Sequence, residues 1–190
     1  MDAASGATDA CAPRLMPVME RTGSPPVNRQ VSTLRSSMRP YRSLNAPANV
    51  DELICRIEQL QPACARQWGT MTPHEMLCHL ADSFSAVLGD LRVSSNETWL
   101  SRTVVKWIAL HTSLPWPHGV STRPEVDPKR DGTKPVEFER DRKTVVDLIR
   151  RFVRPDTRCG RHPGFGGMTR DEWLLWGYGH VDHHLRQFGL

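Results

Sequence analysis

The sequence lacks the features that mark several common classes of protein. It contains no uninterrupted apolar run of about 18 residues, which an ordinary membrane-spanning helix requires. It has no Cys-x-x-Cys pair, and its five cysteines are odd in number, so neither a structural zinc site nor a disulfide framework is expected. No block of consecutive Lys and Arg stands out, and no nucleic-acid-binding motif is present. These absences favour a protein with no membrane or nucleic-acid partner in a reducing cytoplasm.

The composition indicates one globular domain with an appendage. Of the 190 residues, 38% are hydrophobic and 24% are charged, and the net charge of +4 is spread over the chain. Residues 1–40 are rich in Ala, Ser, Pro, Gly and Arg and offer few large apolar side chains, so we expect a flexible N-terminal extension. The helical domain is expected over residues 41–190. Met38 is an alternative first residue of the protein.

Period-2 alternation is missing, whereas helical spacing recurs five times. This helical spacing of apolar residues predicts helices over about 50–67, 73–88, 97–112, 138–153 and 170–188. Capping boxes at Thr72 and Thr169 open the second and the last of these, and Asn49 is a plausible N-cap for the first. The proline-rich connection over 113–137 is long enough to cross a bundle or cover a site. The sequence therefore predicts an all-α protein, a four-helix bundle with one accessory helix.

The last predicted helix brings two histidines onto an apolar face. His180 and His184 are spaced i, i+4 and share that face with Trp173, Trp176 and Phe188. This spacing lets two imidazoles converge on one metal ion. The alternative is a helix end rich in histidine, where the side chains complement the negative end of the helix dipole.

A third histidine lies on the second predicted helix. His79 borders the apolar stripe formed by Met76 and its neighbours, so its side chain can reach the edge of a cavity. The alternative is a rim histidine bonded to Glu75 or Asp82, each close to His79 on the same helix.

Three separated blocks together resemble the DinB-like superfamily, and more narrowly a branch of it named only as a domain of unknown function. The blocks are Trp68-Gly-x-Met-Thr-Pro-x-x-Met-Leu-x-His79, His162-Pro-x-Phe-Gly-x-Met-Thr-x-x-Glu-Trp173 and His180-x-x-His183-His184-Leu-Arg-Gln-Phe188. The resemblance covers residues 41–190. It implies a four-helix bundle that binds a divalent ion through one histidine of the second helix and two of the last.

Carried over residue by residue, the resemblance implies His79, His180 and His184 as metal ligands, with His183 as the competitor of His184. Glu75, Asp82, His183 and Gln187 are candidates for orienting the ligands, although such side chains are often merely solvated. Three imidazoles and solvent suit zinc, nickel, iron, cobalt or manganese. No catalytic acid or base stands out.

The resemblance also implies a metal-dependent enzyme that acts on a small electrophile, by transferase or isomerase chemistry with a low-molecular-weight thiol. A metal-dependent hydrolase and a non-catalytic metal-binding helical module are the alternatives. The expected partner is a small-molecule substrate, and the sequence leaves a homodimer open.

Overall fold

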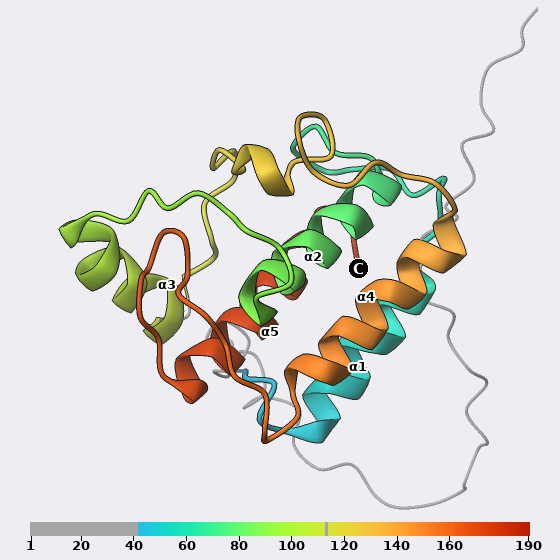
Figure 1. The fold of residues 1–190 in the computed structure, drawn as a ribbon. Coiled ribbons are helices and arrows are strands. Elements are labelled where there is room, and N and C mark those ends of the chain that lie inside the picture. Colours follow the sequence, from blue (N-terminus) through green and yellow to red (C-terminus); the bar gives the residue numbers. More distant parts are fainter. Residues whose placement is uncertain (1–41, 113) are drawn as a thin grey trace, which may run out of the picture.

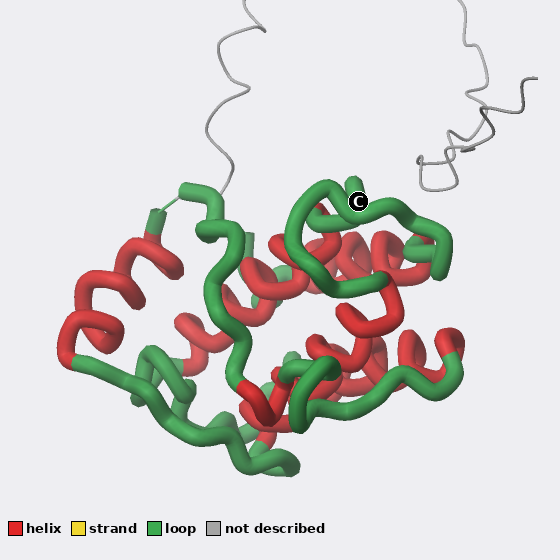
Figure 2. The backbone as a smooth tube through the Cα atoms, turned by 90° about the horizontal axis from the view of Figure 1, so that it is seen from above, coloured by secondary structure: helices red, strands yellow, loops and turns green. Residues whose placement is uncertain are grey.

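The computed structural model describes residues 42–112 and 114–190, and within them the chain is helical (Figures 1 and 2). Five α-helices are joined by loops, and the described part contains no strand, only an isolated bridge between His162 and Gly166. The all-α prediction is therefore confirmed. The predicted extension over residues 1–40 lies outside the described residues. None of the helices in the described part is long and apolar enough to cross a membrane.

Helix α1 spans Pro47–Gln59, which is shorter than the predicted 50–67 and begins earlier. Its N-cap is Ala46, followed by Pro47 in the first turn, where the missing N–H costs nothing. The prediction of Asn49 as N-cap was wrong, because its side-chain amide donates to the Ser43 carbonyl instead. The helix stops at Leu60, whose backbone is extended, and Pro62 two residues later disfavours helical geometry at the residue before it.

Helices α2, Pro73–Leu88, and α5, Arg170–Arg186, begin as the capping boxes predict. In each, the threonine side chain accepts the N3 backbone N–H, and the N3 glutamate accepts the N–H of the threonine. Helix α4 spans Phe138–Phe152, close to the predicted 138–153, and Glu137 caps its first turn. These caps fix the starting points of the helices that carry the site.

The predicted helix over 97–112 is divided. A π-helical turn, η1, spans Ser101–Val105, and the short α3 follows over Lys106–His111. In Figure 1 this unit stands beside the other helices. Trp107 in α3 and Trp99, two residues before η1, are exposed.

The core lies between α1, α2, α4 and α5. Helix α4 packs against α1 and α2, and α5 packs against α1. The rings of Phe84, Phe152 and Trp176 meet edge to face at centroid distances of 5.1, 5.7 and 6.4 Å. Gly177 permits this packing, because a Cβ there would lie 2.8 Å from atoms of both Leu44 and Phe152.

The long connection between α3 and α4 lies against α2. It contains a 3₁₀ turn, η2, over Pro124–Val126, which contacts α2. Thr133 then donates its backbone N–H and its hydroxyl to Asp82 at 2.8 and 2.6 Å. The connection is thus anchored to the helix that carries His79.

Candidate metal centre

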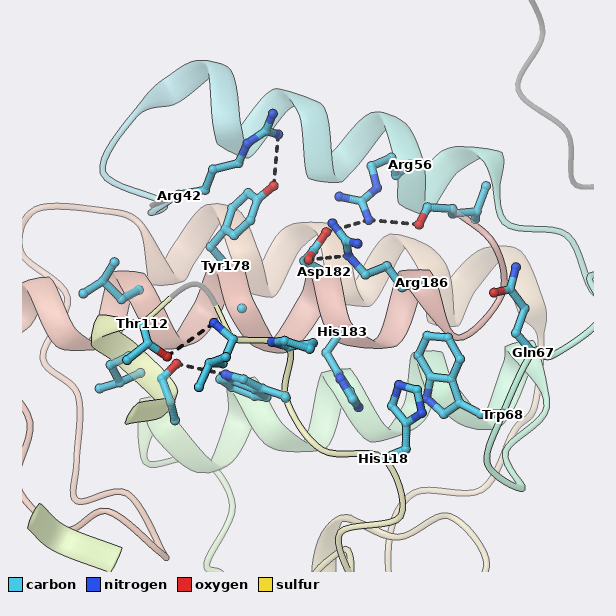
Figure 3. A pocket seen from close by; sticks show the side chains of 18 of the residues that line it. Arg42, Arg56, Gln67, Trp68, Thr112, His118, Tyr178, Asp182, His183 and Arg186 are labelled. Atoms are coloured by element: carbon cyan, nitrogen blue, oxygen red, sulfur yellow. Dashed lines mark hydrogen bonds and ion pairs between the residues drawn. The ribbon is translucent and has the colours of Figure 1, made fainter. Parts of the chain in front are cut away.

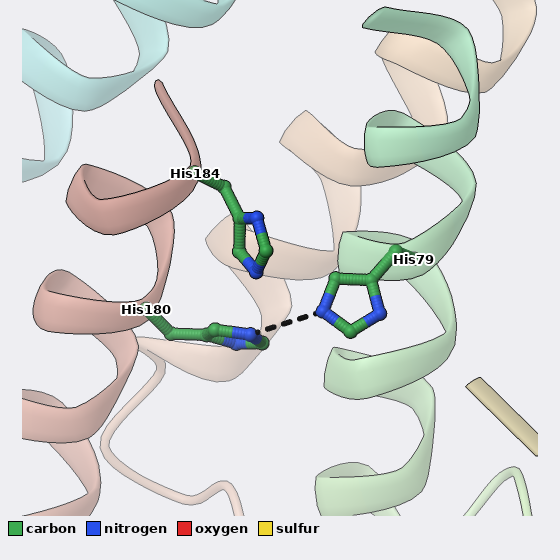
Figure 4. Close-up of side chains that lie close together, drawn as sticks. All are labelled: His79, His180 and His184. Carbon is green, nitrogen blue, oxygen red and sulfur yellow. Dashed lines mark hydrogen bonds between the residues drawn. The ribbon is translucent and has the colours of Figure 1, made fainter. Parts of the chain in front are cut away.

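Three imidazoles converge between α2 and α5 (Figure 4); those of His79 and His180 are buried, and that of His184 is partly buried. One ligand-capable atom of each of His79, His180 and His184 lies within 4.8 Å of the other two, a grouping that could hold a metal ion. The ring centroids are 4.7 to 5.2 Å apart. The structure therefore brings together the three histidines that the sequence singled out.

The closest pair has the spacing of two ligands on one ion. His79 Nε2 lies 3.2 Å from His180 Nε2. For a tetrahedral zinc ion with bonds of about 2.0–2.1 Å to nitrogen, two ligand nitrogens are about 3.3 Å apart. The same contact also accommodates a hydrogen bond, in which one Nε2 donates to the other.

His79 is oriented by a carbonyl group that the sequence did not reveal. Its Nδ1 lies 2.7 Å from the Val126 carbonyl oxygen, so Nδ1 carries the proton and donates it. The lone pair of a neutral ring then lies on Nε2, the atom that faces His180. An outer hydrogen bond of this kind fixes the tautomer and the ring orientation of a metal ligand.

His184 is linked through Gln187 to the loop before α2. Its Nδ1 lies 3.3 Å from Gln187 Oε1, and Gln187 Nε2 donates to the Trp68 carbonyl at 2.9 Å. Gly69 makes room for this amide, because a Cβ there would lie 2.5 Å from Gln187 Nε2, and its φ of 75° also favours glycine. Gln187 is therefore the predicted orienting residue that touches a member of the triad.

His180 has a buried nitrogen with no hydrogen-bond partner, its Nδ1. A buried polar atom of this kind costs free energy, because it has lost its hydrogen bonds to water without gaining others. The ring is packed against Trp176, at a centroid distance of 4.8 Å, and Trp116, at 6.0 Å.

Burial keeps the three imidazoles neutral. It lowers the pKa of His79, His180 and His184, and for His180 the neighbouring His184 and His79 lower the pKa further. The Val126 carbonyl and Asp82 act in the opposite direction on the pKa of His79. Neutral imidazole is the form that binds a metal.

Glu75 and Asp82, which were also predicted to orient the ligands, have local structural roles. Glu75 completes the α2 capping box by accepting the Thr72 N–H at 2.7 Å. Asp82 is buried and holds Thr133, so it acts on His79 through its charge and through the loop. No contact of either carboxylate with the three imidazoles is found in the described part of the chain.

His183 lines a pocket of about 780 Å³ (Figure 3). At one end its ring lies about 6 Å from each of Trp68, Trp116 and His118, and Trp68 stacks on His118 at 4.1 Å. The other end carries three arginines and two carboxylates: Arg42, Arg56, Arg186, Glu52 and Asp182. These charges are paired with one another, as between Arg56 and Asp182 at 2.9 Å.

His162, which belongs to the second block of the sequence motif, has a structural role. Its Nδ1 accepts the backbone N–H groups of Gly164 and Phe165 at 3.0 and 2.9 Å, and its ring stacks on Phe165. Burial lowers its pKa to about 4. It closes the turn that leads into α5.

Comparison with known proteins identifies a family. The family described as "Protein of unknown function (DUF1569)" matches residues 38–189. Searches among curated proteins and among solved structures found no match. Because the match spans most of the sequence and all the described helices, the chain belongs to the DUF1569 family.

Proposed function

We propose that the protein is a divalent-metal-dependent enzyme that acts on a small electrophile together with a low-molecular-weight thiol, on a bundle of the DinB-like type. One observation carries the proposal: three neutral imidazoles from two helices, two of them buried and one partly buried, place their ligand atoms within 4.8 Å of one another. A purely structural core has no need of three such rings, because each buries polar nitrogens that must be satisfied.

The residues fit a divalent ion in number and in chemistry. His79, His180 and His184 would hold it, because one ligand-capable atom of each lies within 4.8 Å of the other two. Three neutral ligands leave a charge of +2 uncompensated, as in catalytic rather than closed structural sites. An ion so bound supplies Lewis-acid chemistry, which acidifies a water or thiol ligand at neutral pH.

The chain's own residues hold the imidazoles and shield them from water. Val126 and Gln187 fix two of the rings, while Trp116 and Trp176 flank His180. The adjacent pocket is of the size that binds small molecules, about 300–1,000 Å³. His183 lies on the pocket wall, with its ring 5.2 Å from that of His184, so a substrate in the pocket would be separated from the triad by little more than this ring.

A second candidate function is a metal-binding helical module without turnover. The observation in its favour is that the pocket is lined by His183 and not by the three imidazoles of the triad. A substrate would then have to displace Trp116 or His183 to reach the centre. A module that only stores or senses the ion has no such requirement.

The test uses full-length protein purified without an affinity tag. Metal content is measured first, and turnover of an activated aryl halide is then followed with a panel of low-molecular-weight thiols. His180→Ala is compared with His111→Ala, a matched change at a more exposed histidine of α3. Thiol-dependent turnover that His180→Ala loses and His111→Ala keeps supports the enzyme.

The other outcomes point elsewhere. One equivalent of metal without turnover favours the non-catalytic module. Metal-dependent hydrolysis of an activated ester without any thiol favours a hydrolase. Absence of metal binding by the three imidazoles overturns the proposal.

A further inference from the structure

A second group of metal-ligating side chains lies on the side of α2 that faces α4. His74 and Cys78 are spaced i, i+4 on α2, and Asp141 lies in the first turn of α4. One ligand-capable atom of each lies within 4.8 Å of the other two. Cys78 and His79 are consecutive, so their side chains leave the helix about 100° apart and serve different sides of it.

The measured distances are close to those of a tetrahedral site. His74 Nε2 lies 2.7 Å from Asp141 Oδ2, and Cys78 Sγ lies 3.8 Å from the same oxygen. Bonds of about 2.0–2.2 Å to nitrogen or oxygen and 2.3 Å to sulfur place such ligand atoms about 3.3–3.6 Å apart. Opening the His74–Asp141 contact by roughly half an ångström, and closing the Cys78 contact slightly, would admit an ion.

The three side chains are held where they are by well-defined helix starts. The capping box at Thr72 fixes the first turn of α2, which carries His74. Glu137 caps α4 by accepting two backbone N–H groups, and the Val136 N–H donates to Asp141 Oδ2 at 3.2 Å. A site on two capped and packed helices requires little ordering when a ligand binds.

Charge distinguishes this group from the three imidazoles. A thiolate and a carboxylate together balance the +2 charge of a divalent ion, which the neutral triad cannot do. The sulfur ligand selects zinc or cobalt over magnesium, calcium and manganese, which prefer oxygen. The His74 and Asp141 side chains are 23% and 17% exposed, so solvent can reach the group and supply a fourth ligand.

We propose that His74, Cys78 and Asp141 form a second metal site, of zinc type, that clamps α2 to α4 and does not depend on the three-imidazole centre. On binding, the sulfur proton of Cys78 leaves to solvent. The proton between His74 Nε2 and Asp141 moves to Nδ1 of the same ring or to solvent.

Cobalt(II) tests this, because a thiolate ligand gives it a sulfur-to-metal charge-transfer band in the near ultraviolet, and the triad contains no sulfur. Tag-free, full-length protein titrated with Co²⁺ should develop this band, and Zn²⁺ should remove it. The double variant His180→Ala/His184→Ala should keep the band in full, which separates this proposal from the proposed function. Cys78→Ser should lose it, whereas Cys55→Ser and Cys159→Ser, at the other free cysteines of the described residues, should not.

His74→Ala and Asp141→Asn provide variants that leave the buried thiol intact, in case Cys78→Ser does not fold. Each should weaken Co²⁺ binding at the sulfur-containing site by more than about tenfold, because loss of a ligand should exceed the ~10–100-fold caused by loss of an outer partner. Absence of a charge-transfer band in saturated wild-type protein would leave only a hydrogen-bonded His74–Asp141 pair and would overturn the proposal. A band that persists unchanged in folded Cys78→Ser, His74→Ala or Asp141→Asn would do the same.

Discussion

Two faces of α5 differ sharply in their surroundings, although residues of the two faces are neighbours in the sequence. One face carries His180, Trp173 and Trp176, which are buried, and His184, which is partly buried and turned towards His79 and His180. The other faces the pocket, where its side chains are partly exposed and mostly charged or polar: Asp182, His183 and Arg186. A single step in sequence, from His183 to His184, therefore changes an imidazole from a pocket wall into a member of the triad, and composition alone does not reveal that change.

The largest effect should follow from removing a ring that belongs to the buried face. His180→Ala and His79→Ala should each abolish binding of the triad's equivalent of metal, a loss beyond the ~10–100-fold caused by removing an outer partner. Titration of the apo proteins with Co²⁺ checks this. Binding at the triad is followed through the part of the Co²⁺ spectrum that lacks the sulfur-to-metal charge-transfer band. His74→Ala is the control and should keep that equivalent, since His74 pairs with Asp141 on another side of α2. A full equivalent retained by His79→Ala at a site without the sulfur-to-metal charge-transfer band would contradict the three-histidine site.

The contrast between neighbours on α5 can be tested directly. His184→Ala should lower metal affinity by at least about tenfold more than His183→Ala, because loss of a ligand should exceed the ~10–100-fold of outer partners. The structure places His184 with His79 and His180 and places His183 against Trp68, Trp116 and His118. Both apo variants would be titrated with the same metal at the same pH. A greater loss in His183→Ala would exchange their assignments.

The sequence predicted the helices better than the groups that orient the site. Both capping boxes and the i, i+4 pair are local signals, so Thr72, Thr169 and the His180/His184 pair could be read directly. The Val126 carbonyl could not, because it is 47 residues from His79 and depends on how the long connection folds over α2. Backbone groups of loops leave no side-chain signal.

Errors at the helix ends have physical causes. Asn49 satisfies a preceding turn instead of the helix, and Pro47 provides the start that a search for capping side chains overlooks. The π-helical turn over Ser101–Val105 could not be predicted from apolar spacing, which does not separate i, i+4 from i, i+5 bonding over one turn.

The pH dependence of stability reports how well His162, which lies beside Trp173 and Trp176 of α5, is shielded from water. Its pKa is about 4 in the folded protein against 6.5 in a free chain, so the unfolded chain binds a proton at higher pH than the native protein. Stability should therefore fall as the pH drops from 6.5 towards 4, by at most about 3 kcal/mol from this residue. His162→Asn can accept the same two N–H groups and does not titrate, so its urea unfolding should depend less on pH over this window. Equal pH dependence of the two proteins would show that His162 is hydrated.

The smallest effect expected concerns Gln187, which joins the triad to the loop before α2. Gln187→Ala removes the partner of His184 Nδ1 and leaves the ring in place, so metal affinity should fall about tenfold, at the low end for an outer partner. Gln187→Glu is the matched variant, because it keeps the acceptor for His184 but loses the donor to the Trp68 carbonyl. If orientation of His184 is what matters, the glutamate variant should bind metal more tightly than the alanine variant. If the link to the Trp68 loop matters instead, both should lose affinity alike, and the buried and pocket faces of α5 would then be coupled through this amide. Isothermal titration of the two variants with Zn²⁺, alongside wild type, distinguishes the two outcomes.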